Sequence, residues 1–445
     1  MNTKPVLSAC GTAAGVALAA LSPSARAGFT FIQIVEARME TSPWLADRAR
    51  GLSPEGGVIV GFGSTTFIAS TGFRWTRSTP ADLGPALFMS GALDASSGGG
   101  VVVGFGSGGS ARRWTALSGS EPLESLNPLT ERPSSARGVS DDGVHIVGQM
   151  RNPDSGDTTG FVWESVENGA QVLAPLVGLT QSDAFAVSGD ASTIGGTSAG
   201  FFPFSFQDIV PFDLFDPGAV CTIWPNDGAF APEPLLLAPP RVKKSGDALP
   251  GRITRLSHDG SVAVGSTFGA PGVVGFIHHR PTSTTLVPAH PHGFGQTDAL
   301  GVSADGRRVV GVFEGGPAGT GAWLWDARGG SIDLTQFLAA RGLPMGFVIT
   351  EARDISSDGT VIAASGLRDN PSEAEAVLIE IPAPCLGDAN GDFVVDFDDI
   401  TTSLSNWLNA YHPFPGTGPG DADLDGDVDF DDITSELSQW LQDCP

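Results

Sequence analysis

Short apolar runs bounded by turn residues recur along most of the chain. Each unit starts with a serine, passes through turn residues into a β-branched run, and ends with a glycine eight residues after the serine. Several of the turns contain Asp-Gly, which supplies the positive φ of a tight hairpin. The pattern therefore predicts short antiparallel strands. Seven copies are present, at residues 53–61, 96–104, 140–148, 188–196, 257–265, 303–311 and 356–364, where Ala364 replaces the last glycine.

An aromatic strand is predicted after the apolar run in most copies, for example at residues 72–75, 160–163 and 321–325. A fourth strand is predicted farther on, as at residues 171–173. Four-stranded units with a repeat spacing like that between Ser53 and Ser96 are typical of β-propeller blades. The sequence therefore predicts a mainly β protein, with a seven-bladed β-propeller over residues 28–382. The alternative, an open β-solenoid, would need more uniform copies and capped ends.

The seventh copy contains only three predicted strands before the chain leaves at Pro382. Residues 29–35 form an alternating segment with no other assignment. We predict that this segment completes the seventh blade, because ring closure hides a strand edge that would otherwise be exposed. A short helix is predicted at residues 334–340.

The repeated pattern Ala-x-x-Val-Ser-x-Asp-Gly, followed by Val-Gly and aromatic-x-Trp, resembles the HAF repeats of bacterial extracellular proteins. The resemblance covers about residues 29–381 and is clearest in the sixth and seventh copies. Copy two lacks the Asp before Gly, and copy four has Gly189, Asp190 and Ala191 instead of x-Asp-Gly. The resemblance implies a secreted β-propeller and no particular reaction.

Helical periodicity replaces strand alternation in the C-terminal segment. Apolar residues recur at helical spacing in two stretches that are 33 residues apart and nearly identical in sequence. One face of a 3.6-residue period is apolar in each. We expect two helices whose apolar faces pack together, formed by Ile400, Leu404, Trp407 and Leu408 and by Ile433, Leu437, Trp440 and Leu441.

A loop rich in side-chain oxygens precedes each predicted helix. Alternate residues of a tight loop place their side chains around one point, and Ca²⁺ takes six to eight oxygen ligands. The backbone carbonyls of Val394 and Asp427 would supply position 7. The ligands predicted for positions 1, 3, 5 and 12 are Asp388, Asn390, Asp392 and Asp399 in loop one, and Asp421, Asp423, Asp425 and Asp432 in loop two.

The two loops differ at the sharp turn, where loop two has Gly426 and loop one has Phe393. Val395 and Val428, at position 8, are the apolar residues expected to hold the loops together. The sequence thus predicts two Ca²⁺ sites, of which only the second follows the pattern throughout.

Two loop–helix units over residues 383–445, with Asp instead of Glu at position 12, resemble a dockerin. The resemblance implies a small all-α module that Ca²⁺ folds and that attaches its protein to a cohesin-like or other cell-surface or extracellular protein. Loop positions 10 and 11 hold Phe397, Asp398, Phe430 and Asp431, whereas better-known dockerins carry small hydroxyl residues that touch cohesin. The resemblance therefore does not fix the partner.

Composition supports a folded, turn-rich protein, with 60 Gly, 33 Pro and 17 % charged residues in 445. The net charge is −26, and the segment 385–445 holds fourteen Asp and Glu and no Lys or Arg. Nucleic acid and anionic membrane surfaces are poor partners for such a chain, because phosphate binding needs a basic surface. Multivalent cations are better ones.

The N-terminus carries features of an export signal. Lys4 precedes a small apolar stretch over residues 11–21, and Ala25, Arg26 and Ala27 fit signal-peptidase cleavage. We predict a signal peptide over residues 1–27 and a secreted or cell-surface protein. Cys10 also ends a lipoprotein-box match, but the nine residues before it are too few for a complete lipoprotein signal. No later stretch has the roughly 18 apolar residues of a membrane span.

Export makes disulfides possible. Cys385 and Cys444 bracket the acidic segment, and a bond between them would stabilise it by roughly 4 kcal/mol in the chain-entropy model. Cys221 is then expected to be a buried small hydrophobic residue. Four histidines, at 278, 279, 290 and 292, are expected in a solvated loop rather than around a metal.

Two functional hypotheses follow. The first is a secreted, non-catalytic binding or structural propeller, displayed or assembled through its C-terminal module, because the repeats lack a nucleophile–base or paired-carboxylate motif. The alternative is an extracellular polysaccharide-degrading enzyme, a glycoside hydrolase or lyase, which would need two carboxylates about 5 to 9.5 Å apart in a central cleft. Carbohydrate is a further candidate ligand, and the insertion at residues 202–245 is the first candidate surface.

Overall fold

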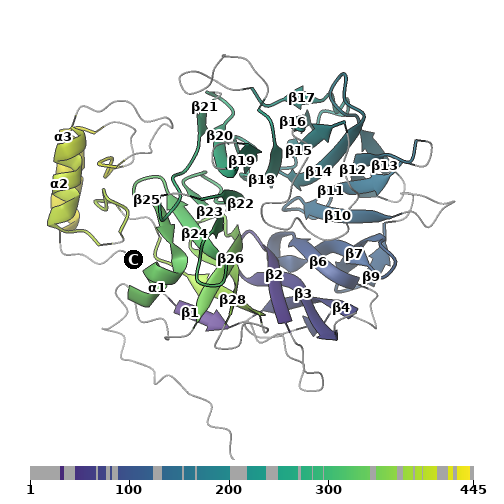
Figure 1. Ribbon diagram of the computed structural model, residues 1–445, viewed down its shortest axis with the longest axis horizontal. Coiled ribbons are helices and arrows are strands. Elements are labelled where there is room, and N and C mark those ends of the chain that lie inside the picture. The colour runs from purple at the N-terminus through teal and green to yellow at the C-terminus, as the bar shows by residue number, and fades with distance from the viewer. Residues whose placement is uncertain are drawn as a thin grey trace, which may run out of the picture.

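The computed structural model describes residues 31–34, 46–66, 69–76, 81–82, 89–123, 133–152, 155–165, 168–200, 218–236, 249–268, 272–282, 284–293, 295–340, 347–367, 374–383, 386–392, 394–407, 419–423 and 428–440. The strands of these residues form seven four-stranded antiparallel sheets arranged as a ring (Figure 1). The innermost strands of neighbouring sheets contact one another all the way round. The prediction of a seven-bladed β-propeller is confirmed.

Each blade runs from an innermost to an outermost strand. The first four blades are β2 (Ala46–Leu52), β3 (Val58–Thr66), β4 (Ala69–Thr76) and β5 (Ala81–Asp82); β6 (Met89–Ala95), β7 (Val101–Gly106), β8 (Ala111–Thr115) and β9 (Gly119–Pro122), with the 3₁₀ turn η2 (Ser97–Gly99); β10 (Ser134–Val139), β11 (Ile146–Arg151), β12 (Thr158–Ser165) and β13 (Gly169–Leu173); and β14 (Gln181–Val187), β15 (Thr193–Ala199), β16 (Val220–Pro225) and β17 (Glu233–Pro234). The last three are β18 (Arg252–Leu256), β19 (Val262–Phe268), β20 (Val273–His279) and β21 (Thr284–Leu286); β22 (Thr297–Val302), β23 (Arg308–Glu314), β24 (Thr320–Asp326) and β25 (Gly330–Asp333), followed by helix α1 (Leu334–Ala340); and β26 (Val348–Ile355), β27 (Val361–Leu367), β28 (Ala374–Glu380) and β1 (Phe31–Ile34).

The N-terminal strand closes the ring. β1 is the outermost strand of the seventh blade and pairs antiparallel with β28, Phe31 opposite Glu380. The prediction that residues near 29–35 complete this blade is confirmed. The edge of β28 is therefore paired.

A serine holds together the first hairpin of every blade. The Ser303 hydroxyl donates to Asp305 Oδ1 at 2.6 Å and accepts a hydrogen bond from Arg308 N at 3.0 Å. The bond to the backbone nitrogen five residues later recurs in all seven copies. The turns also join one blade to the next, as where Ser357 N donates to Pro54 O at 2.8 Å. The repeated serine thus satisfies turn groups that the sheets leave unpaired.

We expect Ser303→Ala to lower the free energy of unfolding by about 1–3 kcal/mol, because it leaves a buried backbone N–H without its acceptor. Ser303 is fully buried. Urea denaturation of the purified protein measures the change, with the exposed Ser118→Ala as control. Equal stability of the two variants would contradict this role for the serine.

Aromatic side chains of the third strands form the contacts between blades. Phe73, Phe161 and Phe276 are buried, and each packs against apolar residues of the preceding blade. Trp323 does the same in the sixth blade, and its indole N–H donates to Val312 O at 3.0 Å. The aromatic strands predicted from the sequence therefore supply the core between the sheets.

Each innermost strand carries a β-bulge at an equivalent place. The pairing register between the first and second strands skips one residue there, and a bulge re-aims the side chain of that residue. The skipped residues line a cavity on the ring axis. They are Arg50, Leu93, Arg137, Phe185, Thr254, Leu300 and Arg353.

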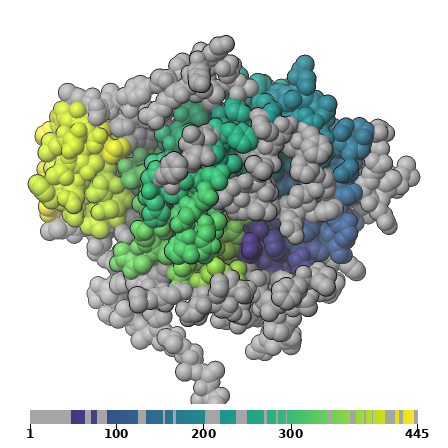
Figure 2. Space-filling view, in the orientation of Figure 1, coloured from purple at the N-terminus to yellow at the C-terminus, as the bar shows by residue number. Residues whose placement is uncertain are grey.

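Two further helices, α2 (Phe397–Asn406) and α3 (Phe430–Gln439), follow the propeller. They contact each other and lie outside the ring, beside the blade that contains β25 (Figure 1). In the space-filling view they form the yellow lobe at the side of the green strands (Figure 2). None of the helices in the described part of the chain has the length and apolar composition required to cross a bilayer.

Candidate functional site

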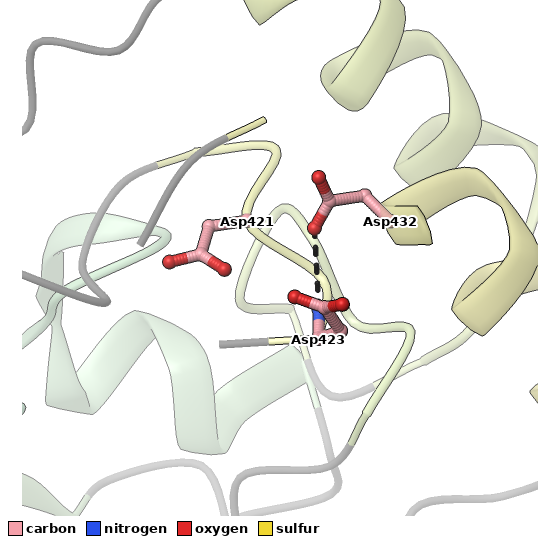
Figure 3. Close-up of side chains that lie close together, drawn as sticks. All are labelled: Asp421, Asp423 and Asp432. Carbon is pink, nitrogen blue, oxygen red and sulfur yellow. Dashed lines mark hydrogen bonds between the residues drawn. The ribbon is translucent and has the colours of Figure 1, made fainter. Parts of the chain in front are cut away.

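Three carboxylates of the second loop surround one point (Figure 3). Oxygen atoms of Asp421, Asp423 and Asp432 lie within 4.8 Å of one another. Asp421 and Asp432 are buried. Carboxylates this close repel one another unless a cation lies between them, and oxygen-only donor sets suit Ca²⁺. The donor set of loop two therefore fits a calcium ion.

The start of helix α3 fixes the position-12 ligand. Asp429 is the N-cap residue, and its side chain accepts a hydrogen bond from Asp431 N at 2.8 Å. Asp432 Oδ2 accepts from Asp429 N at 2.6 Å, and Oδ1 accepts from Ala422 N at 2.6 Å and from Asp423 N at 3.2 Å. This reciprocal capping holds the Asp432 carboxylate over the loop.

The first loop repeats this local geometry. Asp399 Oδ2 accepts from Asp396 N at 2.7 Å, and its Oδ1 accepts from Asn390 N at 3.1 Å. Asp388 Oδ1 accepts from Asp392 N at 3.0 Å. Hydrogen bonds within the loop thus connect the predicted ligands of loop one. Val394, whose carbonyl was predicted at position 7, also takes part, because its N–H donates to Asp392 Oδ1 at 2.9 Å.

The two loops form a symmetric pair. Gly387 N donates to Ala422 O at 2.9 Å, and Gly420 N donates to Ala389 O at 3.0 Å. The donors and the acceptors are each 33 residues apart, so the sequence duplication corresponds to a twofold relation in space. The position-8 residues Val395 and Val428 are both buried. The loops therefore support each other.

Propeller residue Arg328 binds the first loop. It lies in the turn between β24 and β25, and its Nη1 donates to Asp388 O at 2.7 Å. Its Nη2 lies 3.4 Å from Asp388 Oδ2, and both side chains are almost fully buried. Burial raises the pKa of Asp388 to about 6, although the charge of Arg328 opposes the shift. Loop one is thus docked on the sixth blade through a predicted calcium ligand.

The two helices contact each other as expected, but the prediction that Leu404 and Leu437 lie on their inner faces is wrong. Leu404 and Leu437 are exposed, by 55 % and 57 %, and the buried helical side chains are instead Asp399 and Ser403 of α2, with their counterparts in α3. The position-12 carboxylate must point toward its loop, and the residue four positions later shares its face. The leucine that follows that residue is turned outward.

Glu436 is a buried residue that sequence reasoning missed. It corresponds to Ser403 in the duplication, and the Ser403 hydroxyl donates to the Glu436 carboxylate. Burial raises the pKa of Glu436 to about 7, helped by Asp399 and Asp432 and opposed by the hydrogen bond from Ser403. Its spacing of four residues from Asp432 is the signal that could have placed it on the inner face of the helix.

Several predictions fall on parts of the chain that lie outside the described residues. These are the signal peptide at 1–27, the disulfide between Cys385 and Cys444, the ligands Asp425 and Asp427, residue Phe393, and most of the insertion at 202–245. Cys221 is a free, buried cysteine, as predicted, and burial raises the pKa of its thiol.

The histidine prediction is partly wrong. His278 lies in strand β20 and is buried, with Nδ1 2.7 Å from Thr285 Oγ1, and burial lowers its pKa to about 4. The rings of His290 and His292 each contact the ring of Phe313, with centroids 5.2 Å apart. The β-branched run before His278 and His279 places them in strand β20. The contacts with Phe313 in β23 hold His290 and His292 in place.

Two buried carboxylates, Asp94 and Asp354, flank Arg255 near the ring axis. Arg255 Nη1 lies 3.1 Å from Asp94 Oδ2, and its Nη2 lies 2.6 Å from Asp354 Oδ2. The two carboxylates also accept hydrogen bonds from backbone N–H groups of the next blades, Val139 at 3.0 Å and Leu52 at 2.9 Å. The Arg255 guanidinium thus lies between the two carboxylates. Through it the fifth blade is joined to the second and seventh blades, which carry the carboxylates, and to the third and first blades, which donate the N–H groups.

A second buried ion pair lies nearby, in β26. Arg353 Nη2 is 2.9 Å from Glu351 Oε2, and both side chains are almost fully buried. Burial alone would raise the pKa of Glu351, but the charges of Arg353, Arg50 and Arg48 outweigh it and lower the pKa to about 2.

A group with a lowered pKa stabilises the fold above its unfolded pKa, here 4.5, and that contribution is lost as the pH falls toward the folded value of about 2. We therefore expect Glu351→Gln to cost about 3 kcal/mol at pH 7. The difference from the wild type should shrink as the pH falls from about 5 to 2. Denaturant titrations across this range measure it, and a difference that does not change with pH would contradict the assignment.

Comparison with known proteins gives a likeness of fold. No family model matches the chain, and no curated protein matches it. An oligogalacturonate lyase in complex with manganese is similar over 80 % of this chain and 98 % of its own, with 12 % identity and a TM-score of 0.49. An oligogalacturonate lyase from Vibrio parahaemolyticus is similar over 80 % and 97 %, with 11 % identity and a TM-score of 0.46. For TolB from Acinetobacter baumannii the shares are 74 % and 65 %, with 10 % identity and a TM-score of 0.35.

Proposed function

We propose that this protein is an exported, non-catalytic β-propeller that binds Ca²⁺ through its C-terminal loop pair and is held by another extracellular protein through the same module. The observation that carries the proposal is the set of three loop-two carboxylates, Asp421, Asp423 and Asp432, around one point. Their charge and burial call for a cation, and the predicted signal peptide favours a calcium-rich exterior.

Exposed apolar side chains supply the surface for a partner. Phe397 and Phe430 are exposed by 63 % and 64 %, and each lies on the same helix as an exposed leucine, Leu404 or Leu437. All four are related by the 33-residue duplication, so the module presents the same apolar pair twice. We take each pair as one contact surface, because contiguous exposed apolar patches mark interaction sites. A cohesin-like or other cell-surface protein with an apolar patch is the proposed partner.

The experiment is a pull-down of secreted proteins from the producing cells, with the full chain as bait. We expect one partner to be retained with Ca²⁺ and lost with chelator. The double variant Phe397→Asp with Phe430→Asp should lose it, because one phenylalanine alone leaves the second copy of the surface intact. Leu117→Asp, at a fully exposed propeller leucine, is the matched control. Retention by the double variant, or retention in chelator, would refute the proposed attachment.

A further inference from the structure

The cavity on the propeller axis is unlike the rest of this acidic protein. Its volume is about 40 Å³, and four of its lining residues are arginines: Arg50, Arg137, Arg255 and Arg353. No aspartate or glutamate is among the described residues that line it. The whole chain has only 24 Lys and Arg against 50 Asp and Glu. A cavity lined by four guanidinium groups therefore needs an explanation.

The bulges explain how three of the four arginines reach the axis. Arg50, Arg137 and Arg353 are the bulged residues of the first, third and seventh blades. In a regular strand, successive side chains point to the two faces of the sheet in turn, and none points along the sheet toward the ring axis. The extra residue instead aims one side chain per blade into the centre.

Neighbouring groups hold the guanidinium planes in place. Arg255 is bound between Asp94 and Asp354, Arg353 is bound to Glu351, and Arg137 Nε lies 3.5 Å from Asp183 Oδ1. Arg50 and Arg137 also lie over the rings of Phe62 and Phe185, at 4.8 Å and 4.7 Å from the centroids. These carboxylates are not among the described residues that line the cavity, so they orient the guanidinium groups from outside it.

Such fixed donors suit an anion. A guanidinium presents five N–H donors in a planar fork that matches a carboxylate. Donors already fixed in place lose little freedom when a ligand binds. The volume admits a group the size of a few water molecules. Thr254 and three apolar residues, Leu93, Leu300 and Phe185, complete the wall, and the apolar residues favour an apolar body over a fully hydrated ion.

We propose that the axial cavity binds a small organic anion, with its carboxylate on the arginines and its apolar part against Leu93, Leu300 and Phe185. The site is separate from the calcium module and makes no use of it. It gives the propeller a ligand of its own.

The test uses acetate as the probe, with acetamide as the neutral analogue and inorganic phosphate as the competing anion. Isothermal titration of the full-length protein should show acetate binding at one site and no heat with acetamide. Arg50→Gln and Arg137→Gln should each weaken it by about tenfold or more, the factor that equals ~1.4 kcal/mol. Arg112→Gln, which makes the same charge change on β8, away from the cavity, should leave binding unchanged.

A second measurement needs no variant. Bound ligand stabilises the native state, so acetate should raise the thermal midpoint of the wild-type protein, the more so at higher concentration, and acetamide should not. Absence of both heat and stabilisation with acetate overturns the proposal. Equal binding of acetamide, tighter binding of phosphate, or unchanged binding by both cavity variants overturns it as well.

Discussion

Replacing Asp432 with asparagine is expected to remove one of the two calcium ions that we propose the protein binds. Asp432 brings the position-12 carboxylate to the point shared with Asp421 and Asp423. Asparagine keeps one oxygen and can still accept from Asp429 N, but it loses the charge and the second oxygen ligand. We expect the affinity of loop two to fall by at least about a hundredfold, beyond the physiological range of such loops. Isothermal titration of chelator-treated, full-length protein measures both sites.

The matched control is Asp431→Asn, which makes the same charge change at the adjacent, exposed position. It should retain two sites. Without calcium, we expect Asp432→Asn to have a more stable C-terminal module than Asp431→Asn, because it relieves repulsion among the carboxylates of loop two. Two unaltered sites in Asp432→Asn would show that loop two does not bind calcium through this residue.

Asp326→Asn is expected to cost about 3–5 kcal/mol of folding free energy, the usual penalty for breaking a buried ion pair from one side. Asp326 is buried, and its carboxylate receives Arg308 Nε at 3.0 Å and Arg328 Nε at 3.3 Å. Arg308 Nη1 in turn donates to Gly359 O and to Pro382 O, both at 2.8 Å. The neutral amide would remove the counter-charge that the two buried guanidinium groups share, while Arg328 would keep its contact with Asp388.

Denaturant unfolding at saturating Ca²⁺ measures this cost without a contribution from the metal. Glu314→Gln, at an exposed position of the same blade, is the control and should change stability by less than about 0.5 kcal/mol. A loss for Asp326→Asn below about 1 kcal/mol would mean that Arg308 and Arg328 find other partners in the variant, contrary to the packing described.

Local chemistry explains which features could be predicted from the sequence. The Ser-x-Asp-Gly turn closes its own hydrogen bonds within six residues, as from Ser303 to Arg308, so its pattern is visible in the chain. The ring closure was predictable because the seventh copy lacked a fourth strand and the N-terminal segment, which contains β1, had no other assignment. The duplication likewise fixed both loop–helix units.

The features that could not be predicted depend on contacts between distant residues. The bulges that aim Arg50 and Arg353 at the axis are a matter of register between strands, and a one-residue shift leaves no local signature. The inner face of α3 is set by a metal-ligand position rather than by apolarity, so Leu437 was assigned to the wrong side. The contact of Arg328 with Asp388 joins two units that the sequence presents as separate.

The pairing of β1 with β28 also determines the order in which the molecule can fold. Phe31 lies opposite Glu380, so the last blade joins residues separated by nearly the whole propeller. Contacts between positions so far apart form slowly, because a long chain must first be ordered. Six blades can assemble from local hairpins, whereas the seventh must await both ends of the propeller. Until then, the open edges of its strands are the part of the chain most exposed to pairing with another copy.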